Sequence, residues 1–227
     1  MVQRLYFTQA DHDRITAAVG AAERESDGEI VTIVAQNSDA YHDVGLQWAI
    51  GVVFLALSIV AAFPHIARTL IARLIGEWDH VIEDWIFLTL LLGLLILKFL
   101  IVRYALAWIP LRMALTPRAT KARRVRRRAV ALFRAVAQGR TRAKTGVMLY
   151  LSLDEHRAEI VADASINDRV APAVWGEAMA ALIAGVKADQ AAQGMVDAVT
   201  QVGAILTAHF PRSEDDVNEL PDRLIEL

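Results

Sequence analysis

Apolar residues gather along this chain in two long runs that polar side chains hardly interrupt. The runs cover residues 44–63 and 85–109, and each is long enough for a helix that crosses the roughly 30 Å hydrocarbon core of a bilayer. Residues 86–102 include 14 Leu, Ile, Phe or Val side chains, whose summed preference for lipid outweighs the cost of inserting Lys98. The pattern predicts a hairpin of two membrane spans over residues 44–111. A pair of core helices in a soluble protein is the alternative.

The link between the two runs, residues 64–84, is itself amphipathic. Its apolar residues recur at helical spacing, which predicts a helix that lies in the membrane interface rather than a flexible loop. These residues are Ile66, Leu70, Ile71, Leu74, Ile75, Trp78 and Ile82.

The residues before the first run predict one helix and one strand. Apolar side chains recur at intervals of three and four over residues 9–25, and Thr8 followed by Asp11 has the form of a capping box. Residues 29–35 then contain a continuous run of β-branched side chains, which is typical of a buried strand.

The residues after the second run predict a helix, a pair of strands and two further helices. Residues 122–136 are apolar at every third or fourth position and mostly Arg elsewhere, which indicates an amphipathic helix. Residues 147–153 and 158–162 have the composition of strands, and the short polar turn between them predicts an antiparallel hairpin. One helix then extends over residues 172–186, and the next ends before Pro211.

These elements divide the chain into four parts. Residues 1–43 and 112–211 together predict one α/β domain, a small mixed β-sheet flanked by helices, which the transmembrane hairpin of residues 44–111 interrupts. Without the hairpin, the flanks have the length of a single compact domain. The acidic tail, residues 212–227, contains too few apolar residues to fold alone. Three apolar residues of this tail are expected to dock on the domain: Leu220, Leu224 and Ile225.

Positive charge is concentrated directly after the second span. The net charge is -2, yet residues 112–144 contain twelve Lys or Arg and no Asp or Glu. Because basic segments beside spans stay in the cytoplasm, this asymmetry predicts two spans in the cell (inner) membrane with both termini cytoplasmic. The arginines of the basic helix are expected to face the anionic headgroups of the lipid bilayer; the alternative is that they only enforce topology. They are Arg123, Arg124, Arg126, Arg127 and Arg128. Nucleic acid is not expected as a partner, because the rest of the domain is acidic.

Three acidic residues are candidates for a metal site. Asp39 follows the first predicted strand, and Asp163 and Asp168 follow the third, so the three are expected to converge at one edge of the sheet. Carboxylate oxygens suit Ca²⁺ or Mg²⁺. The alternative is that Asp163 and Asp168 are loop acids near the dipole of the next helix. The chain contains no Cys, and no nucleotide-binding or nucleophile motif accompanies its His residues, so no catalytic residue is assigned.

Two stretches of this sequence resemble the TPM domain family. One is FTQAD at residues 7–11 leading into GEIV at residues 28–31, and the other is KTGVMLYLSL at residues 144–153 followed by RAEIVAD at residues 157–163. The resemblance implies two kinds of activity: acid phosphatases or calcium binders, and accessory proteins of membrane complexes. We expect a membrane-anchored accessory or scaffolding module with a membrane protein partner. A metal-dependent, acid-phosphatase-like hydrolase is the alternative.

Overall fold

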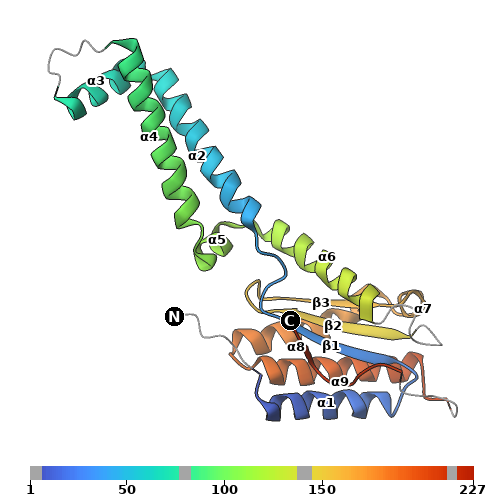
Figure 1. The fold of residues 1–227 in the computed structure, drawn as a ribbon. Coiled ribbons are helices and arrows are strands. Elements are labelled where there is room, and N and C mark those ends of the chain that lie inside the picture. The colour runs from blue at the N-terminus through green and yellow to red at the C-terminus, as the bar shows by residue number, and fades with distance from the viewer. Residues whose placement is uncertain (1–6, 77–82, 137–144, 214–218) are drawn as a thin grey trace. The chain divides into compact units, whose positions relative to one another are not determined.

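The chain forms two compact units, each with its own elements and its own core (Figure 1). The computed structural model describes residues 7–76, 83–136, 145–213 and 219–227. Unit 1 contains residues 1–39 and 117–227, and unit 2 contains residues 40–116. Unit 1 thus combines segments from both sides of the apolar runs.

Unit 1 is built on a four-stranded sheet with the strand order β3-β2-β1-β4. Its strands are β1 (Glu29–Ala35), β2 (Gly146–Ser152), β3 (Arg157–Ala162) and β4 (Ile225–Glu226). β1 pairs in parallel with β2 over its whole length, whereas β2 pairs antiparallel with β3. The predicted α/β class with a small mixed sheet is confirmed, and the strands before and after the apolar runs lie side by side in it.

Helices cover both faces of this sheet, so unit 1 has three layers (Figure 1). The covering helices are α1 (Gln9–Glu23), α6 (Arg118–Val136), α8 (Gly176–Lys187) and α9 (Ala191–His209). Ile30 and Val34 of β1 share a core with α1, α8 and α9. Val31 and Ile33 point to the other face and pack against α6. Successive strand residues point to opposite faces, so a strand covered on both sides requires the continuous apolar run seen in the sequence.

Capping and proline explain the local boundaries of two helices. α1 begins after Thr8, whose hydroxyl accepts a hydrogen bond from the Asp11 N–H, while the Asp11 carboxylate accepts one from the Thr8 N–H. The predicted capping box is therefore confirmed. The helix ends at Glu23, before the predicted end at residue 25. The segment predicted to be helical from Pro172 opens instead as a 3-10 turn, Pro172–Trp175, a frequent form of helix start, before α8 continues.

The C-terminal segment has more structure than its composition predicted. Leu220 and Leu224 are buried, as expected from docking. Residues 225–226 form β4, a strand that the sequence did not predict, beside the end of β1. The Leu227 N–H donates to the Val34 carbonyl oxygen at 2.9 Å. Such a short strand has no hydrophobic pattern of its own and forms because the edge of β1 presents unpaired backbone groups.

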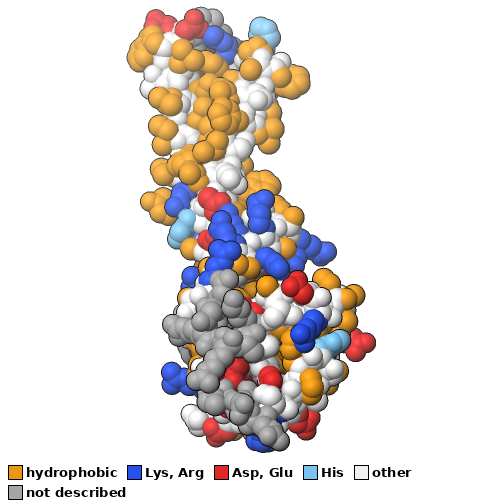
Figure 2. Space-filling model, turned by 90° about the vertical axis from the view of Figure 1, so that its right-hand side faces the viewer, with side chains coloured by type: hydrophobic (Ala, Val, Ile, Leu, Met, Phe, Trp, Pro, Cys, Tyr) orange, Lys and Arg blue, Asp and Glu red, His pale blue; other side chains and the backbone are white. Residues whose placement is uncertain are grey.

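Unit 2 contains the apolar helices α2 (His42–Ala62) and α4 (Asp84–Ala105). Both are long and apolar enough to cross a membrane, and only 17% and 11% of their most apolar windows are buried. A core helix of a soluble protein would be mostly buried, whereas Figure 2 shows hydrophobic side chains over most of this unit's surface in view. The second apolar run does not continue to residue 109 as one helix. It ends as α4 at Ala105, and a separate helix, α5 (Ile109–Leu115), follows with Pro110 in its first turn, where proline is tolerated although it is excluded from a helix interior.

The amphipathic link begins with α3 (Pro64–Ile75), as its spacing predicted. Ile71 and Ala72 of α3 are buried in a cluster with residues of α4. Arg68 forms an ion pair with Asp84 at 2.6 Å, and its guanidinium lies 4.8 Å from the ring centre of Phe87. These contacts attach α3 to the start of α4. The predicted continuation over residues 77–82 lies outside the described residues.

Candidate functional site

A buried polar network lies at the carboxyl ends of β1 and β2. Ser38 follows β1, and its hydroxyl hydrogen-bonds to the hydroxyls of Tyr150 and Ser152, each at 3.0 Å. Glu155, in the turn between β2 and β3, accepts hydrogen bonds from the Ser152 hydroxyl and, at 2.9 Å, from the Ser38 N–H. The network therefore holds the segment that leaves β1 against the end of β2.

Burial determines what this network can do chemically. Tyr150 and Ser152 have no exposed surface, and Glu155 is 5% exposed. Burial raises the pKa of the Tyr150 hydroxyl above its usual value of 10.0, and the hydrogen bond with Ser38 opposes that shift. Tyr150 is therefore neutral at physiological pH, and Ser152 has no surface open to a substrate. The network anchors backbone segments and does not form an open catalytic centre.

Asp39 lies next to this network and binds two arginines of α6. Its Oδ2 atom is 3.2 Å from Nη1 of Arg124 and 3.4 Å from Nη2 of Arg127. The Arg124 side chain is 13% exposed, whereas that of Arg127 is 73% exposed. Asp39 is also the last residue of unit 1 before the chain continues into unit 2. The two ion pairs thus join α6 to the end of the segment that follows β1.

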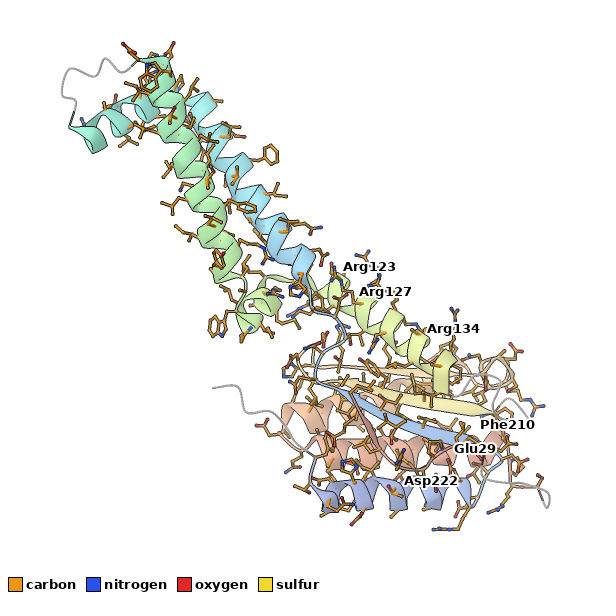
Figure 3. The ribbon with its side chains drawn as sticks, in the orientation of Figure 1. Glu29, Arg123, Arg127, Arg134, Phe210 and Asp222 are labelled. Carbon is orange, nitrogen blue, oxygen red and sulfur yellow. The ribbon has the colours of Figure 1, made fainter. Side chains whose placement is uncertain are left out.

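The helix α6 has an apolar stripe and a basic face. Its apolar stripe repeats every fourth residue and is buried against the sheet: Val125, Ala129 and Phe133. Figure 3 shows Arg123, Arg127 and Arg134 on the other side of the helix, directed away from the sheet. In Figure 2, Lys and Arg side chains gather over one part of the surface of unit 1. The amphipathic pattern read from the sequence therefore separates an apolar contact from a cationic surface.

The five arginines assigned to this surface do not all lie on it. Arg123, Arg126, Arg127 and Arg128 are exposed. Arg126 also forms an ion pair with Glu159 of β3 at 3.0 Å. Arg124 is the exception, because it turns toward Asp39. Arg134, which was not among the arginines predicted for this surface, is exposed and follows Arg127 by two helical turns, a spacing that places both on the same face of α6.

The three acids expected to share a metal ion lie at different ends of the sheet. Asp163 follows β3, and its carboxylate accepts a hydrogen bond from the Gly146 N–H at the start of β2, at 3.1 Å. Asp168 caps the nearby helix α7 (Ala164–Asn167). Because β3 is antiparallel to β2, the loop after β3 returns to the amino end of β2, whereas Asp39 lies beyond the carboxyl end of β1. The expected convergence is wrong. The described residues include no group of three His, Cys, Asp or Glu side chains placed to hold a metal.

Arg112 of α5 is a candidate that the sequence did not single out. It is 5% exposed, and it donates from Nε to the Leu106 carbonyl oxygen at 2.7 Å and from Nη2 to that of Ala107 at 3.2 Å. Its Nη1 donates to the Ala40 carbonyl oxygen at 2.6 Å and lies 3.2 Å from Nδ1 of His42. The last carbonyls of a helix attract cations, so Arg112 caps α4 and joins it to the start of α2. Nothing in the sequence distinguishes it from the other cations of the basic segment.

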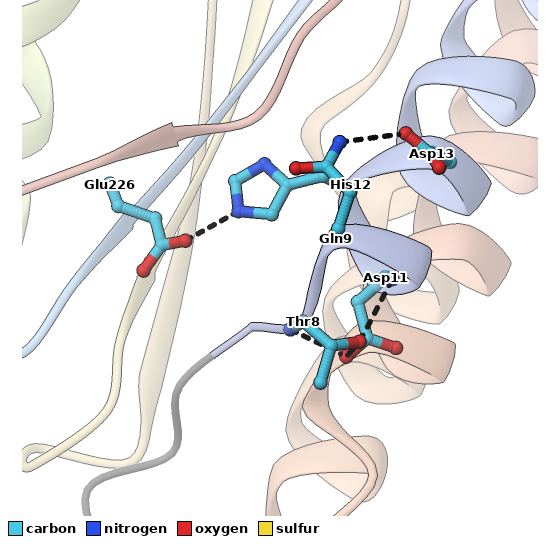
Figure 4. Close-up of polar contacts among 6 residues, drawn as sticks. All are labelled: Thr8, Gln9, Asp11, His12, Asp13 and Glu226. Carbon is cyan, nitrogen blue, oxygen red and sulfur yellow. Dashed lines mark hydrogen bonds and ion pairs between the residues drawn. The ribbon is translucent and has the colours of Figure 1, made fainter.

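The start of α1 contacts the C-terminal strand. Nε2 of His12 lies 2.5 Å from Oε1 of Glu226. Figure 4 shows this contact together with the Thr8 capping box. The two side chains are 26% and 40% exposed, and exposed pairs of this kind contribute little to stability. The contact places β4 beside α1 without making a reactive centre.

A cavity of about 420 Å³ lies between the start of α1 and the start of α9. It is lined by Phe7, Asp11, Arg14 and residues 189–193. The Arg14 guanidinium donates to the Gln193 side chain and lies 3.6 Å from Asp11. Because protein groups already bind its one lining cation, the cavity gives no basis for assigning a ligand.

The fold and its basic helix define a helix-covered α/β domain connected to a pair of apolar helices. Residues 109–205 match the TPM domain, which confirms the resemblance of this part of the chain to the TPM domain family. The match includes α6, β2, β3, α8 and most of α9, and strand pairing adds β1 and β4 to the same sheet.

A solved structure has a similar fold. The NMR structure of the BA42 protein from the psychrophilic bacterium Bizionia argentinensis aligns with a TM-score of 0.57 and 18% identity, over 100% of this chain and 99% of that chain. At this level of identity the likeness concerns the fold alone. No curated protein matches the chain.

Proposed function

We propose that this chain is a membrane-anchored TPM domain that works as an accessory or scaffolding module for other membrane proteins. It acts at the cytoplasmic surface of the cell membrane, where the basic face of α6 binds anionic lipid headgroups. The observation that carries the proposal is the row of exposed arginines on α6, a helix that begins at Arg118, shortly after α4 ends at Ala105.

Chain length and charge support this placement. Residues 106–117 connect α4 to α6, and even a fully extended chain of that length spans at most about 40 Å. The basic face is therefore tethered near the bilayer surface if α4 crosses it. Each cation close to an anionic leaflet contributes about 1 kcal/mol of binding free energy. Several exposed arginines on one helix face are enough to hold the domain in one orientation.

Both termini are proposed to be cytoplasmic. Two spans return the chain to the side from which it started, and the basic segment after the second span favours the cytoplasm. A reporter fused after Leu227 should therefore be inaccessible from outside intact cells. Reactivity of that reporter with an impermeant reagent would contradict the orientation.

The hydrolase alternative has less support. Its proposed ligands, Asp39, Asp163 and Asp168, lie at different ends of the sheet. The accessory role predicts that the purified full chain does not turn over phosphate esters with Ca²⁺ or Mg²⁺, and that it crosslinks to a membrane protein in native membranes. Turnover abolished by Asp163→Asn would instead favour the hydrolase.

A spin label on α6 tests the lipid contact directly. The chain has no Cys, so Ala131→Cys provides a unique attachment point at an exposed position of α6. The labelled full chain is reconstituted in vesicles that contain a nickel-chelating lipid, and collisions between the label and the headgroup-bound nickel are measured. Collisions should be frequent with phosphatidylglycerol present, rare with phosphatidylcholine alone, and reduced by high salt, which screens exposed charges.

Two variants of equal charge change make the test specific. Arg123→Gln with Arg134→Gln removes two exposed cations of the α6 face, whereas Arg24→Gln with Lys187→Gln removes two exposed cations elsewhere in unit 1. At about 1 kcal/mol per cation, the α6 double variant should weaken headgroup contact by roughly 30-fold. The control should change it little. The proposed surface would be refuted if the two variants had equal headgroup contact, or if headgroup contact did not depend on the charge of the lipid.

A further inference from the structure

We infer that anionic headgroups compete with Asp39 for Arg127, so that lipid binding by α6 loosens the segment through which the chain leaves the sheet. This inference rests on the proposed function and adds a regulatory contact to the same surface. The ligand is the phosphate of an anionic lipid.

Of the ion pairs that Asp39 forms with Arg124 and Arg127, the one with Arg127 can exchange its partner. Arg124 is 13% exposed and lies 3.2 Å from the carboxylate, whereas Arg127 is 73% exposed and lies 3.4 Å away. Phosphate and carboxylate bind the same guanidinium fork. Arg127 therefore lies on the basic face of α6 and also pairs with Asp39. Arg124, which is less exposed, keeps its ion pair with Asp39. A headgroup on Arg127 leaves the carboxylate with the less exposed arginine.

The position of Asp39 in the chain couples lipid binding on Arg127 to the stability of the segment around Asp39. Its neighbour Ser38 is anchored in unit 1 by Glu155 at 2.9 Å. Its other neighbour, Ala40, is anchored in unit 2 by Arg112, which donates to its carbonyl oxygen at 2.6 Å. The Asp39 ion pairs lie between these two anchored residues in the sequence. Weakening one of them lowers the free energy needed to open the segment next to the hairpin.

Linkage makes the effect reciprocal. If lipid on Arg127 weakens the hold on Asp39, then removal of the Asp39 charge must strengthen lipid binding by the same factor. Exposed ion pairs are weak, so the expected factor is at most about fivefold. A contact this weak suits a switch, because a stronger pair would not yield to a headgroup.

The experiment compares two neutralised carboxylates in the full chain. Asp39→Asn frees Arg127, whereas Glu159→Gln frees Arg126, and both change the net charge by the same amount. Hydrogen exchange of the Ser38 amide is measured in nanodiscs of phosphatidylcholine with and without phosphatidylglycerol. Headgroup contact is followed in the same samples with the label at residue 131.

The inference predicts a distinct result for each protein. In the wild type, phosphatidylglycerol should speed Ser38 exchange by up to about fivefold. Asp39→Asn should exchange fast in both lipids and bind the anionic headgroup up to about fivefold more tightly. Glu159→Gln should keep the lipid response of the wild type.

Three outcomes would overturn the inference. If the label contacts anionic headgroups but Ser38 exchange does not respond to lipid, the coupling is wrong and the proposed function stands. If Glu159→Gln behaves like Asp39→Asn, net charge alone explains the result and the specific competition is wrong. If the label never contacts anionic headgroups, the inference and the proposed lipid surface both fail.

Discussion

The crossing of α8 and α9 provides a sharp test of the packing in unit 1. The two helices meet at Gly185 and Gly194. A Cβ atom added to Gly185 would lie 2.6 Å from Cα of Gly194, 2.8 Å from its nitrogen and 2.9 Å from the Gln190 carbonyl oxygen. Ordinary contact for such an atom begins at 3.4 Å. The substitution Gly185→Ala therefore forces a methyl group into three backbone atoms.

The size of the effect follows from what these atoms can do. Backbone atoms cannot rotate away as a side chain does, so the helices must separate by about 0.8 Å, the difference between 2.6 and 3.4 Å. Overpacking of this kind costs about 1–3 kcal/mol. The higher helix propensity of Ala offsets at most about 1 kcal/mol of that cost. Gly185→Ala should destabilise unit 1 by about 1–2 kcal/mol.

A second glycine of the same helix supplies the control. Gly176, at the start of α8, has a helical φ of -61° and no atom within 4 Å of an added Cβ. Gly176→Ala should leave the stability unchanged or raise it by up to about 1 kcal/mol. Native-state hydrogen exchange of the β1 amides, in the full reconstituted chain, reports the free energy of opening for each variant. Protection in Gly185→Ala equal to or above that in Gly176→Ala would show that the helices do not cross this closely.

Three further predictions concern other contacts. Thr8→Val should cost about 1 kcal/mol, and it should flatten the acid side of the stability profile. The Thr8 hydroxyl lowers the pKa of Asp11, so this stability is present above pH 3.8 and is lost as the pH falls through the folded-state pKa; exchange protection of α1 between pH 5 and 2 measures it. Burial raises the Tyr150 pKa, so its neutral form contributes stability below pH 10 that is lost as the pH rises through the folded-state pKa. Tyr150→Phe should reduce that alkaline loss, as measured by β2 exchange protection at pH 9 and 11, and an unchanged alkaline slope would contradict the assignment. Arg112→Met leaves three carbonyl oxygens without their donor, and it should speed exchange at the end of α4 by about 30-fold, or about 2 kcal/mol, whereas Arg103→Met should not.

Local structure was predictable wherever neighbouring residues determine it. The strand over residues 29–35 was predicted with the bounds that β1 has, because a continuous β-branched run favours extended backbone and a doubly covered strand. The capping box at Thr8 was predictable because both partners lie within one turn of helix. The amphipathic periodicity of residues 122–136 likewise identified both the buried stripe and the basic face of α6.

The metal prediction failed because it depended on the direction in which β3 runs beside β2, and composition does not determine strand direction. The sequence showed that Asp163 follows a strand, but the antiparallel pairing of β3 sends that residue to the amino end of β2 and away from Asp39. Long-range strand pairing also explains the unpredicted strand β4. Its partner, β1, lies almost two hundred residues earlier in the chain. A two-residue segment acquires its structure from that partner and not from its own pattern.

The sequence by itself determined the apolar helices, the strand and helix order, and the charge asymmetry, since each depends on residues close together in the chain. Only the tertiary structure decided which charges remain on the surface. Arg124 and Arg127 lie one helical turn apart in the same basic segment, yet the side chain of one is 13% exposed and that of the other is 73% exposed. Their exposure depends on the packing of α6 against the sheet and on the position of Asp39. Those contacts join residues that are far apart in the sequence, so the residues next to Arg124 and Arg127 in the chain do not predict them.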